Sequence, residues 1–275
     1  MSTELCFLKL GGSLITDKNK ASTPRTEVIA RLAEEVAAAC AQKPSLRLIV
    51  GNGAGSFGHV PAKRYGTRQG VHTPEEWRGF AEVWREAAAL NRLVTDALHA
   101  AGLPAIAFPP SAAVTSRDGQ VVSWDLSPLH LALQAGLLPV VQGDVIFDTA
   151  RGGTILSTED LFQHLARALR PRRILLAGLE QGVWADFPAC TRLVAEITPK
   201  NLPEVAPALS GSNATDVTGG MASKVQQSLV LVQEISGLEI LIFSGEKAGL
   251  VKDALLGARV GTTLRDSAIE KQFRL

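Results

Sequence analysis

Leu5-Cys6-Phe7-Leu8-Lys9-Leu10-Gly11-Gly12-Ser13 begins as an apolar run and ends in two glycines beside a lysine. The same transition recurs where Leu46-Arg47-Leu48-Ile49-Val50 leads into Gly53-Ala54-Gly55-Ser56-Phe57-Gly58-His59. Glycine allows backbone N–H groups to approach an oxyanion closely, and a neighbouring basic residue adds positive charge. Both segments therefore predict phosphate binding. One such loop would indicate a cofactor, whereas two indicate a donor and an acceptor.

Short runs rich in Val, Ile and Leu alternate with longer helical patterns along the whole chain. Buried strands separated by helices predict an α/β fold with a mainly parallel sheet covered on both faces. Ligands of such sheets bind beyond the carboxyl ends of the strands, and both glycine segments fall there. The predicted strands are 5–10, 46–50, 104–108, 121–124, 138–147, 173–177 and 239–243.

Several predicted helices have clear start signals. Thr73-Pro74-Glu75-Glu76 is a capping box that opens a long helix to about Ala101, and Thr23-Pro24 opens another to about Gln42. Two stretches rich in small polar residues and glycine, 64–73 and 207–218, are predicted to be mobile loops near the ligands. Further helices are predicted to begin at Ser127-Pro128, at Ser157 or Thr158, at Thr198-Pro199 and at Gly219-Gly220, and the last spans 247–256.

Length and composition limit the class of protein. The 275 residues are 46% hydrophobic and 20% charged, which predicts one ordered globular domain, with room for two lobes. A net charge of +1 argues against a general nucleic-acid or membrane-surface role, which needs many clustered positive charges. Three separated cysteines, no signal-peptide pattern and no apolar run near the roughly 20 residues of a membrane span lead us to expect a reduced, cytoplasmic protein.

Two known nucleotide motifs fit poorly. Gly53, Gly55 and Gly58 satisfy the G-x-G-x-x-G spacing of a dinucleotide site, but the polar segment that follows, 59–73, contains two glycines and a proline where a Rossmann unit continues into its helix. The Walker A spacing is absent from 11–18. Phosphate binding is therefore predicted without either fold motif.

Charged residues elsewhere admit two interpretations each. Lys9 is either a solvent-facing lysine or a cation held over the first loop. The segment from Asp216 to Lys224 favours the second interpretation, because two glycines open a helix there with Lys224 one turn inside. His59 is either structural or a hydrogen-bond donor to phosphate at the end of a glycine-rich turn. The pair Glu159 and Asp160 either favours a helix start electrostatically or orients the lysines and helps to hold magnesium.

The motifs together resemble the amino acid kinase superfamily, in the form found in isopentenyl phosphate kinases. The segment from Leu8 to Lys18 resembles the first motif of those kinases, and Gly53 to His59 resembles the second, including its Phe-Gly-His ending. Gly143 to Asp148 and Asp216 to Met221 resemble further family segments. The similarity covers nearly the whole chain. It implies a three-layer αβα sandwich with an open, mainly parallel central sheet, which usually dimerises.

The resemblance also implies a division of labour. The acceptor, isopentenyl phosphate, would bind in the N-terminal lobe, about 1–170, and ATP with Mg²⁺ in the C-terminal lobe, about 171–275. Catalysis would involve Lys9, Lys18, His59 and Lys224. Residues implied to bind ATP are Lys9, Gly11, Gly12, Ser13, Gly55, Gly182, Gly220 and Lys224, those implied to bind the acceptor are Ala54, Gly58, His59 and Thr158, and no residue is implied as a metal ligand.

Three segments depart from the family pattern. Asn52-Gly53-Ala54-Gly55 replaces His-Gly-Gly-Gly, so a methyl group stands at the middle amide. Ser157-Thr158-Glu159-Asp160 replaces Ser-Gly-Asp-Asp, which puts the substrate contact of Thr158 and the carboxylate geometry of Glu159 in question. Residues 178–184 read Gly-Leu-Glu-Gln-Gly-Val-Trp instead of Thr-Asp-Val-Asp-Gly-Val-Tyr, which places the nucleotide contacts in question.

Two alternatives stay open. One is a kinase of the same superfamily with another small acceptor; a carboxylate acceptor would call for an arginine pair, for which Arg64 and Arg68 are candidates. The other is a non-catalytic regulator that binds nucleotide. For isopentenyl phosphate, the hydrocarbon tail is expected against apolar residues of the 74–101 helix, with Phe80, Val83 and Trp84 as candidates.

Overall fold

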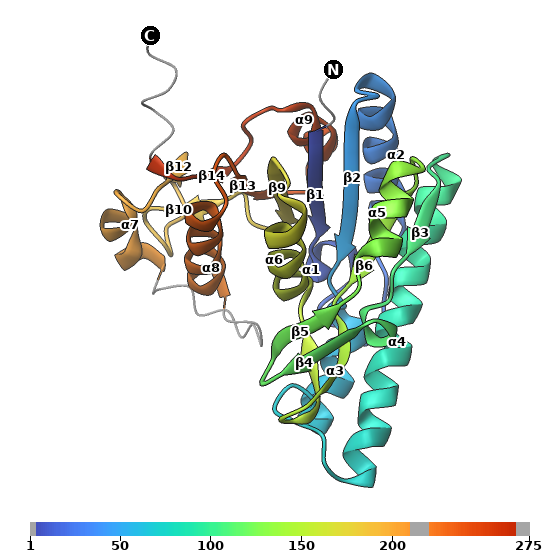
Figure 1. The fold of residues 1–275 in the computed structure, drawn as a ribbon. Helices are drawn as coiled ribbons and strands as arrows, with labels where there is room; N and C mark the ends of the chain where they lie inside the picture. Colours follow the sequence, from blue (N-terminus) through green and yellow to red (C-terminus); the bar gives the residue numbers. More distant parts are fainter. Residues whose placement is uncertain (1–3, 210–219, 268–275) are drawn as a thin grey trace.

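The centre of the protein is an eight-stranded sheet. A computed structural model describes residues 4–209 and 220–267. Its strand order is β12-β14-β13-β9-β1-β2-β6-β3, and every neighbouring pair is parallel except β13 with β14 (Figure 1). The strands are β1 (Glu4–Leu10), β2 (Leu46–Asn52), β3 (Ala105–Ala107), β6 (Leu138–Gln142), β9 (Arg173–Gly178), β12 (Glu196–Ile197), β13 (Glu239–Ser244) and β14 (Thr262–Leu264).

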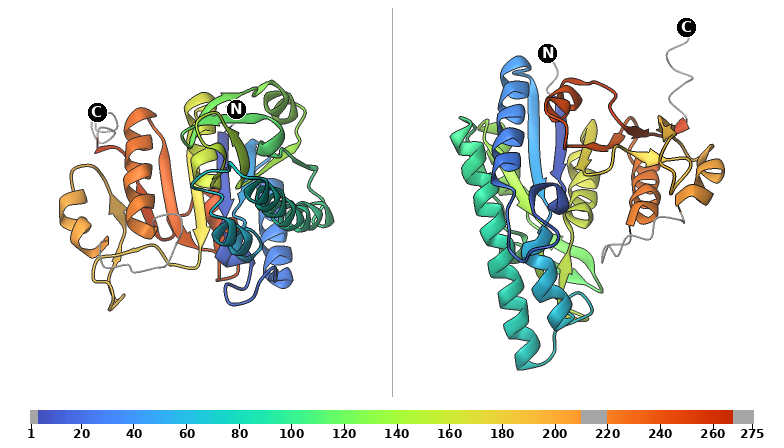
Figure 2. Two further views of the ribbon diagram at one scale, coloured as in Figure 1. Left: turned by 90° about the horizontal axis from the view of Figure 1, so that it is seen from below. Right: turned by 180° about the vertical axis from the view of Figure 1, so that it is seen from behind.

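Helices cover both faces of this sheet, so the predicted three-layer αβα sandwich is confirmed (Figure 2). Successive side chains of a strand point to opposite faces. On β1, Leu8 belongs to one core cluster and Phe7 to the other. The first cluster includes residues of α2 (Thr26–Gln42), α4 (Pro74–Ala100) and α9 (Leu250–Leu256), and the second those of α5 (Ser127–Gln134), α6 (Thr158–Leu169) and α8 (Gly220–Glu234).

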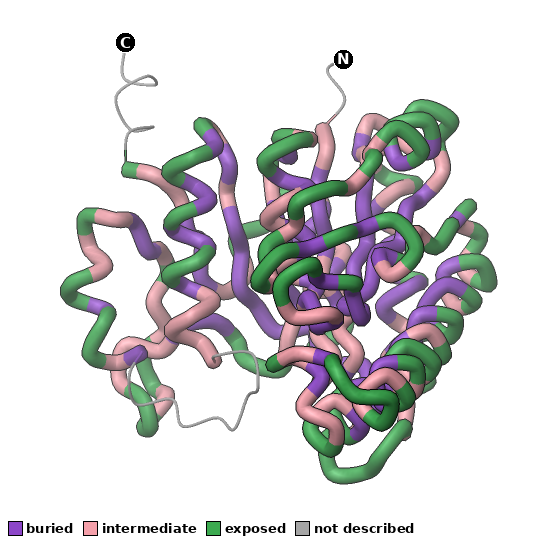
Figure 3. Tube along the Cα trace, turned by 60° about the horizontal axis from the view of Figure 1, so that its bottom comes forward, coloured by how far each residue is buried: buried purple, intermediate pink, exposed green. Residues whose placement is uncertain are grey.

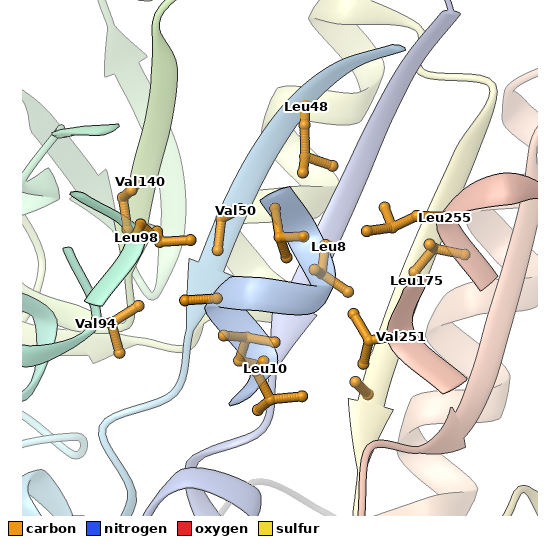
Figure 4. Packing of buried hydrophobic residues seen from close by; sticks show 14 of the residues in the cluster. Leu8, Leu10, Leu48, Val50, Val94, Leu98, Val140, Leu175, Val251 and Leu255 are labelled. Carbon is orange, nitrogen blue, oxygen red and sulfur yellow. The ribbon is translucent and has the colours of Figure 1, made fainter. Parts of the chain in front are cut away.

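The core is built from aliphatic side chains of the central strands. Figure 4 shows Leu8, Val50 and Leu175 from the sheet beside Val251 and Leu255 of α9, with Val94 and Leu98 of α4 at the other end of the cluster. Each fully buried side chain of this size contributes about 1.5–3 kcal/mol of hydrophobic stabilisation. Figure 3 shows the buried residues concentrated along the strands and on the inner sides of the helices. In the described ranges, 4–209 and 220–267, no helix is both long and apolar enough to cross a membrane.

A second, four-stranded sheet in the order β5-β4-β7-β8 lies beside the N-terminal half of α4. The prediction of one strand over 138–147 is wrong, because the chain leaves the large sheet at Gly143. β6 pairs with β2 and β3, whereas β7 pairs with β4 and β8. The strands of this sheet are β4 (Val114–Arg117), β5 (Gln120–Trp124), β7 (Asp144–Asp148) and β8 (Gly152–Leu156), and a separate hairpin pairs β10 (Val183–Trp184) with β11 (Leu193–Val194).

The observed starts of the helices can be compared with those predicted from capping residues. The box at Thr73 is confirmed, since its hydroxyl accepts from the Glu76 amide and the Glu76 carboxylate accepts from the Thr73 amide. Pro24 does not start α2, because it forms an isolated bridge with Thr16, and the helix begins at Thr26. The helices expected after Thr198 and Lys247 begin later, as α7 (Leu202–Leu209) and α9.

Neither glycine segment was predicted to be helical. α1 (Gly12–Ile15) and α3 (Gly55–Tyr65) occupy the two glycine segments, so His59 lies inside a helix and not at the end of a turn. Between α3 and α4, the segment 66–73 is tied to its surroundings: the Thr67 amide donates to the Ala62 carbonyl and the Val71 amide to Arg151. Residues 207–209 of the other predicted mobile loop belong to α7, and the rest of it lies outside the described residues.

Candidate active site

The two glycine loops are in direct backbone contact. Register places Leu10 opposite Asn52, so β1 and β2 end at the same edge of the sheet. A Cβ atom on Gly12 would lie 2.4 Å from the Gly55 amide nitrogen, and one on Gly55 would lie 2.3 Å from the Thr16 hydroxyl. Gly55 also has a φ of +50°, a conformation that side chains disfavour. Glycine is therefore needed here so that the loops can approach each other.

Some loop amides are already used by the protein, and others are not. The Gly11 amide donates to the Ala177 carbonyl at 2.8 Å, and the Gly53 amide to the Leu10 carbonyl at 3.0 Å. Among the described residues, no acceptor is found for the amides of Gly12, Ser13, Ala54 and Gly55. The N-caps of α1 and α3, Gly11 and Ala54, have no side-chain hydrogen bond to the helix. Four backbone donors thus remain for a ligand at the ends of β1 and β2.

Lys9 and Lys224 converge on one carboxylate. Glu159, in the first turn of α6, forms an ion pair with Lys9, and the two side chains are only 16% and 11% exposed. Burial by itself would raise the pKa of Glu159, but the charges of Lys9 and Lys224 lower it below its ordinary value. Glu159 is therefore ionised at neutral pH, and it links a lysine at the end of β1 to one in α8.

The neighbouring carboxylate, that of Asp160, caps the start of α6. Its side chain accepts hydrogen bonds from the Ser157 amide at 2.8 Å and hydroxyl at 2.7 Å, while the Ser157 hydroxyl accepts from the Asp160 amide. Ser157 and Asp160 thus form the capping box of α6. Arg68 forms an ion pair with the same Asp160 oxygen at 3.5 Å. Of the two interpretations of this acidic pair, Asp160 supports the helix-start role and Glu159 the lysine-orienting role.

A polar cleft lies between α6 and α8. Its lining includes the α6 start and the α8 start, with Arg68 from the segment after α3. An adjoining apolar pocket shares Glu159, Lys224 and Gln227 with it and extends along Phe162, Leu176 and Ile240. The cleft is lined by Arg68, Ser157, Glu159, Asp160, Gly220, Lys224 and Gln227.

Buried polar side chains support the α6 start from below. The Thr158 hydroxyl donates to the Asn52 carbonyl at 2.7 Å, and the Asn91 side chain donates to the Asn52 side chain at 2.8 Å. All three residues are at most 4% exposed. Two positions that depart from the family pattern, Asn52 and Thr158, are thus partners. The bond between them engages the hydroxyl of Thr158, which the resemblance implied as a substrate contact.

Asp144 lies near this network and is almost fully buried. Its carboxylate accepts from the Ser111 amide at 3.1 Å and from the Val145 amide at 2.9 Å. Burial raises the pKa of Asp144 to about 6, although these hydrogen bonds oppose the rise. A fraction of Asp144 is therefore protonated near neutral pH.

The remaining predicted residues are spread over both halves of the protein. His59 is exposed in α3, and Gly58 precedes it where a Cβ atom would lie 2.6 Å from that of Ala54. Lys18 is exposed in the segment between α1 and α2. The last two glycines belong to the C-terminal half: Gly220 opens α8 in the cleft, and Gly182 packs against Thr262, where a Cβ atom would lie 2.6 Å from the hydroxyl.

Comparison with known proteins identifies the family. The family model described as "Amino acid kinase family" matches residues 4–244. The chain belongs to the amino acid kinase family. Within it, the chain is 35% identical to an isopentenyl phosphate kinase of Methanothermobacter thermautotrophicus and 32% identical to one of Methanocaldococcus jannaschii, each over 94% of this chain and 98% of the relative.

Solved structures of amino acid kinase folds agree with the architecture. A structure described as "X-ray structures of isopentenyl phosphate kinase" superposes with a TM-score of 0.79 and 30% identity, covering 94% of this chain and 99% of that one. An isopentenyl phosphate kinase substrate complex gives a TM-score of 0.75 at 26% identity. The similarity thus extends over at least 94% of this chain in both comparisons.

Proposed function

We propose that this protein is an ATP-dependent kinase that transfers the γ-phosphoryl group of ATP to isopentenyl phosphate, giving isopentenyl diphosphate and ADP. The observation that carries the proposal is the convergence of Lys9 and Lys224 on Glu159, at the edge of the sheet where the two glycine loops leave backbone donors open. The full-length similarity to isopentenyl phosphate kinases supports the choice of acceptor.

The chemistry requires charge and positioning more than it requires a base. The second ionisation of a phosphate monoester falls near pH ~6, so the acceptor oxygen is already an anion at neutral pH. The difficulty is to bring two polyanions into line, and phosphoryl transfer is catalysed mostly by positioning and electrostatics. Lys9 and Lys224 supply the charge in this proposal. Glu159 orients them through its ionised carboxylate.

The other residues take supporting roles in the same proposal. Gly11, Gly12, Ser13 and Gly55 line the phosphates, and Lys18 approaches those of the donor from its exposed position. His59 and the loop at Ala54 and Gly58 meet the acceptor phosphate, with Thr158 beneath it. Gly182 and Gly220 contact the nucleotide in the C-terminal half.

Magnesium, bound with ATP, would neutralise phosphate charge. Among the described residues, no group of three or more His, Cys, Asp or Glu side chains is placed to hold a metal ion. Glu159 is paired with Lys9, and Asp160 caps α6. In kinases Mg²⁺ commonly keeps several waters and binds one or two carboxylates together with the substrate phosphates, so in this proposal phosphates and water supply most of its ligands. The chain's own contribution is the lysine charge around it.

The hydrocarbon tail is proposed to contact the apolar cluster beside α4. Phe80 and Val83 are 7% and 3% exposed and pack with Val71 and Val145, and the Phe80 ring lies 5.2 Å from that of Phe147. Trp84 differs from them, because it is 46% exposed. We therefore assign the tail contact to Phe80 and Val83 and leave Trp84 out of it.

One assay tests the proposal directly. Purified protein with ATP and Mg²⁺ is tested for ADP release with isopentenyl phosphate, dimethylallyl phosphate, UMP, glutamate and acetylglutamate. We expect isopentenyl phosphate to exceed the nucleotide and the carboxylates in kcat/KM by a wide margin. A preference for UMP or a carboxylate, or nucleotide binding without turnover, would contradict the proposed function.

We also propose a cytoplasmic homodimer. The edge strand β3 exposes Ile106 by 41%, and α5 exposes Leu131 by 65%, so apolar surface is available near the open edge of the sheet. Sedimentation equilibrium should give twice the mass of one 29.1 kDa chain. A single-chain mass at micromolar concentration would exclude the dimer.

A further inference from the structure

We propose that Arg68 binds the phosphate of the acceptor from the rim of the polar cleft and so helps to select a phosphorylated acceptor. The proposal rests on the proposed function for the identity of that acceptor. Arg68 follows α3 and lines the cleft together with Lys224 and Gly220, which belong to α8 on the opposite side. Arg68 and Lys224 thus place a positive charge on opposite sides of the cleft between the starts of α6 and α8.

The backbone of Arg68 is held firmly. Its carbonyl accepts a hydrogen bond from the Thr154 hydroxyl at 2.9 Å and another from the Arg151 side chain at 3.4 Å. The preceding residue, Thr67, is fully buried. The following segment is fixed by the bond from the Val71 amide to the Arg151 carbonyl at 2.8 Å. These contacts to β8 and the β7–β8 turn set the position from which the guanidinium enters the cleft.

The guanidinium retains donors for a ligand. Within the described part of the chain, its one hydrogen bond runs from Nη2 to Asp160 at 3.5 Å, which is long for a charged pair. Asp160 does not depend on it, because Ser157 already supplies that carboxylate oxygen with two shorter bonds. An arginine side chain carries five N–H donors in a planar fork that matches phosphate oxygens. The weak hydrogen bond to Asp160 orients the guanidinium group and leaves its other N–H donors available.

Arg64, the other member of the predicted arginine pair, lies in a different environment. It is exposed near the end of α3, and its guanidinium stacks 4.9 Å from the centre of the neighbouring Tyr65 ring. It is not among the residues that line the cleft. The two arginines therefore do not form a clamp for a carboxylate acceptor. Arg64 serves instead as a matched control, with the same charge and only four residues away.

The side of the cleft indicates which phosphate Arg68 contacts. Arg68 belongs to the N-terminal half, directly after the helix whose start forms the second glycine loop. The donor in the proposed function is bound by the C-terminal half, from which Lys224 and Gly220 enter the cleft. An anion that Arg68 binds in the cleft is therefore that of the acceptor, while Lys224 faces the transferred group from the other side.

The experiment compares Arg68→Gln with Arg64→Gln in steady-state kinetics and in calorimetric titration with isopentenyl phosphate and with inorganic phosphate. We expect Arg68→Gln to raise the acceptor KM about 10- to 100-fold. The dissociation constants of isopentenyl phosphate and inorganic phosphate should rise by the same factor, which is the range for a lost charge-assisted contact. The KM for ATP should change less than about twofold. Arg64→Gln should match the wild type, and Arg68→Lys should recover part of the affinity.

Each outcome decides the proposal. Equal behaviour of the two glutamine variants, or a rise confined to the KM for ATP, would overturn it. A thermal melt of each variant identifies loss of fold, in which case Arg68→Lys, which keeps the charge, supplies the comparison. If the wild type turns over no isopentenyl phosphate but phosphate binding still depends on Arg68, the proposed function fails while the Arg68 site stands.

Discussion

The starts of α3 and α6 lie at the same edge of the large sheet, where the Thr158 hydroxyl donates to the Asn52 carbonyl, but the two starts are capped differently. α6 begins with Ser157 and Asp160, whose side chains satisfy its first amides. α3 begins at Ala54, which offers no capping side chain, and the amides of Ala54 and Gly55 have no acceptor among the described residues. A capped start stabilises a helix, whereas an open start costs stability and attracts an anion. The start of α6 thus carries Glu159 on a capped turn, while we propose that the start of α3 receives a ligand.

The largest expected effect concerns Lys9, which pairs with Glu159 in the first turn of α6. Lys9→Ala should lower kcat at least ~100-fold, because it removes a cation that stabilises the transition state and leaves Glu159 without its partner. Lys43→Ala is the matched control, since Lys43 pairs with Glu4 at the opposite end of β1. Single-turnover kinetics with the acceptor measure the difference. Equal rates for the two variants would remove Lys9 from catalysis.

The next prediction concerns a substitution at Ala54, the N-cap of α3. Ala54→Asp should raise the acceptor KM at least ~10-fold, because a carboxylate beside the free amides repels phosphate and competes for them. The same charge should leave the melting temperature unchanged or slightly higher, since anions stabilise helix N-termini. Ala54→Asn, which has the size of Asp without its charge, is the control. If the Asp and Asn variants show the same KM, negative charge at the α3 start does not affect acceptor binding.

A smaller effect concerns the buried support of α6. Thr158→Val should lower the free energy of unfolding by about 1–2 kcal/mol, because the Asn52 carbonyl loses its donor in a buried place. Thr158→Ser keeps the hydroxyl and should recover most of the loss. Urea denaturation of the three proteins gives the values. A Val variant as stable as the wild type would show that the hydrogen bond does not support this helix start.

The smallest expected effect comes from comparing the loss of each capping box, the one at Ser157 on α6 and the one at Thr73 on α4. Ser157→Ala on α6 and Thr73→Ala on α4 should each cost about 1 kcal/mol in thermal or chemical unfolding. Only the change at Ser157 should also reduce kcat, by a few fold, because that turn carries Glu159. If Thr73→Ala lowers kcat equally, the activity loss reflects stability in general and not the position of Glu159.

Much of the sandwich was predictable from local patterns. The β-rich runs at 5–10, 46–50, 173–177 and 239–243 became central parallel strands, because strands buried on both faces read as continuous apolar sequence. The capping box at Thr73 was equally clear. Strands β4, β8 and β14 and the strands of two residues were missed, since segments of two to five residues carry little periodicity.

The site was less predictable because its decisive contacts join distant residues. The bond between Asn52 and Thr158 spans 106 positions, and no local pattern announces it. Helix α3 was missed because Gly55, Gly58 and Pro61 all disfavour a helix interior, and packing against α4 overrides them. The roles of Glu159 and Asp160 could have been separated, since a capping box places its acidic residue three positions after Ser157.

The backbone contact between Gly12 and Gly55 has a consequence for the evolution of this enzyme. Because neither Gly12 nor Gly55 can gain a methyl group without displacing the other loop, the two loops share their geometry at this contact. If Arg68 and the apolar residues of α4 contact the acceptor as proposed, new acceptor preferences are expected to arise at these peripheral positions. The paired loops would remain as a constant frame while the surrounding side chains diverge.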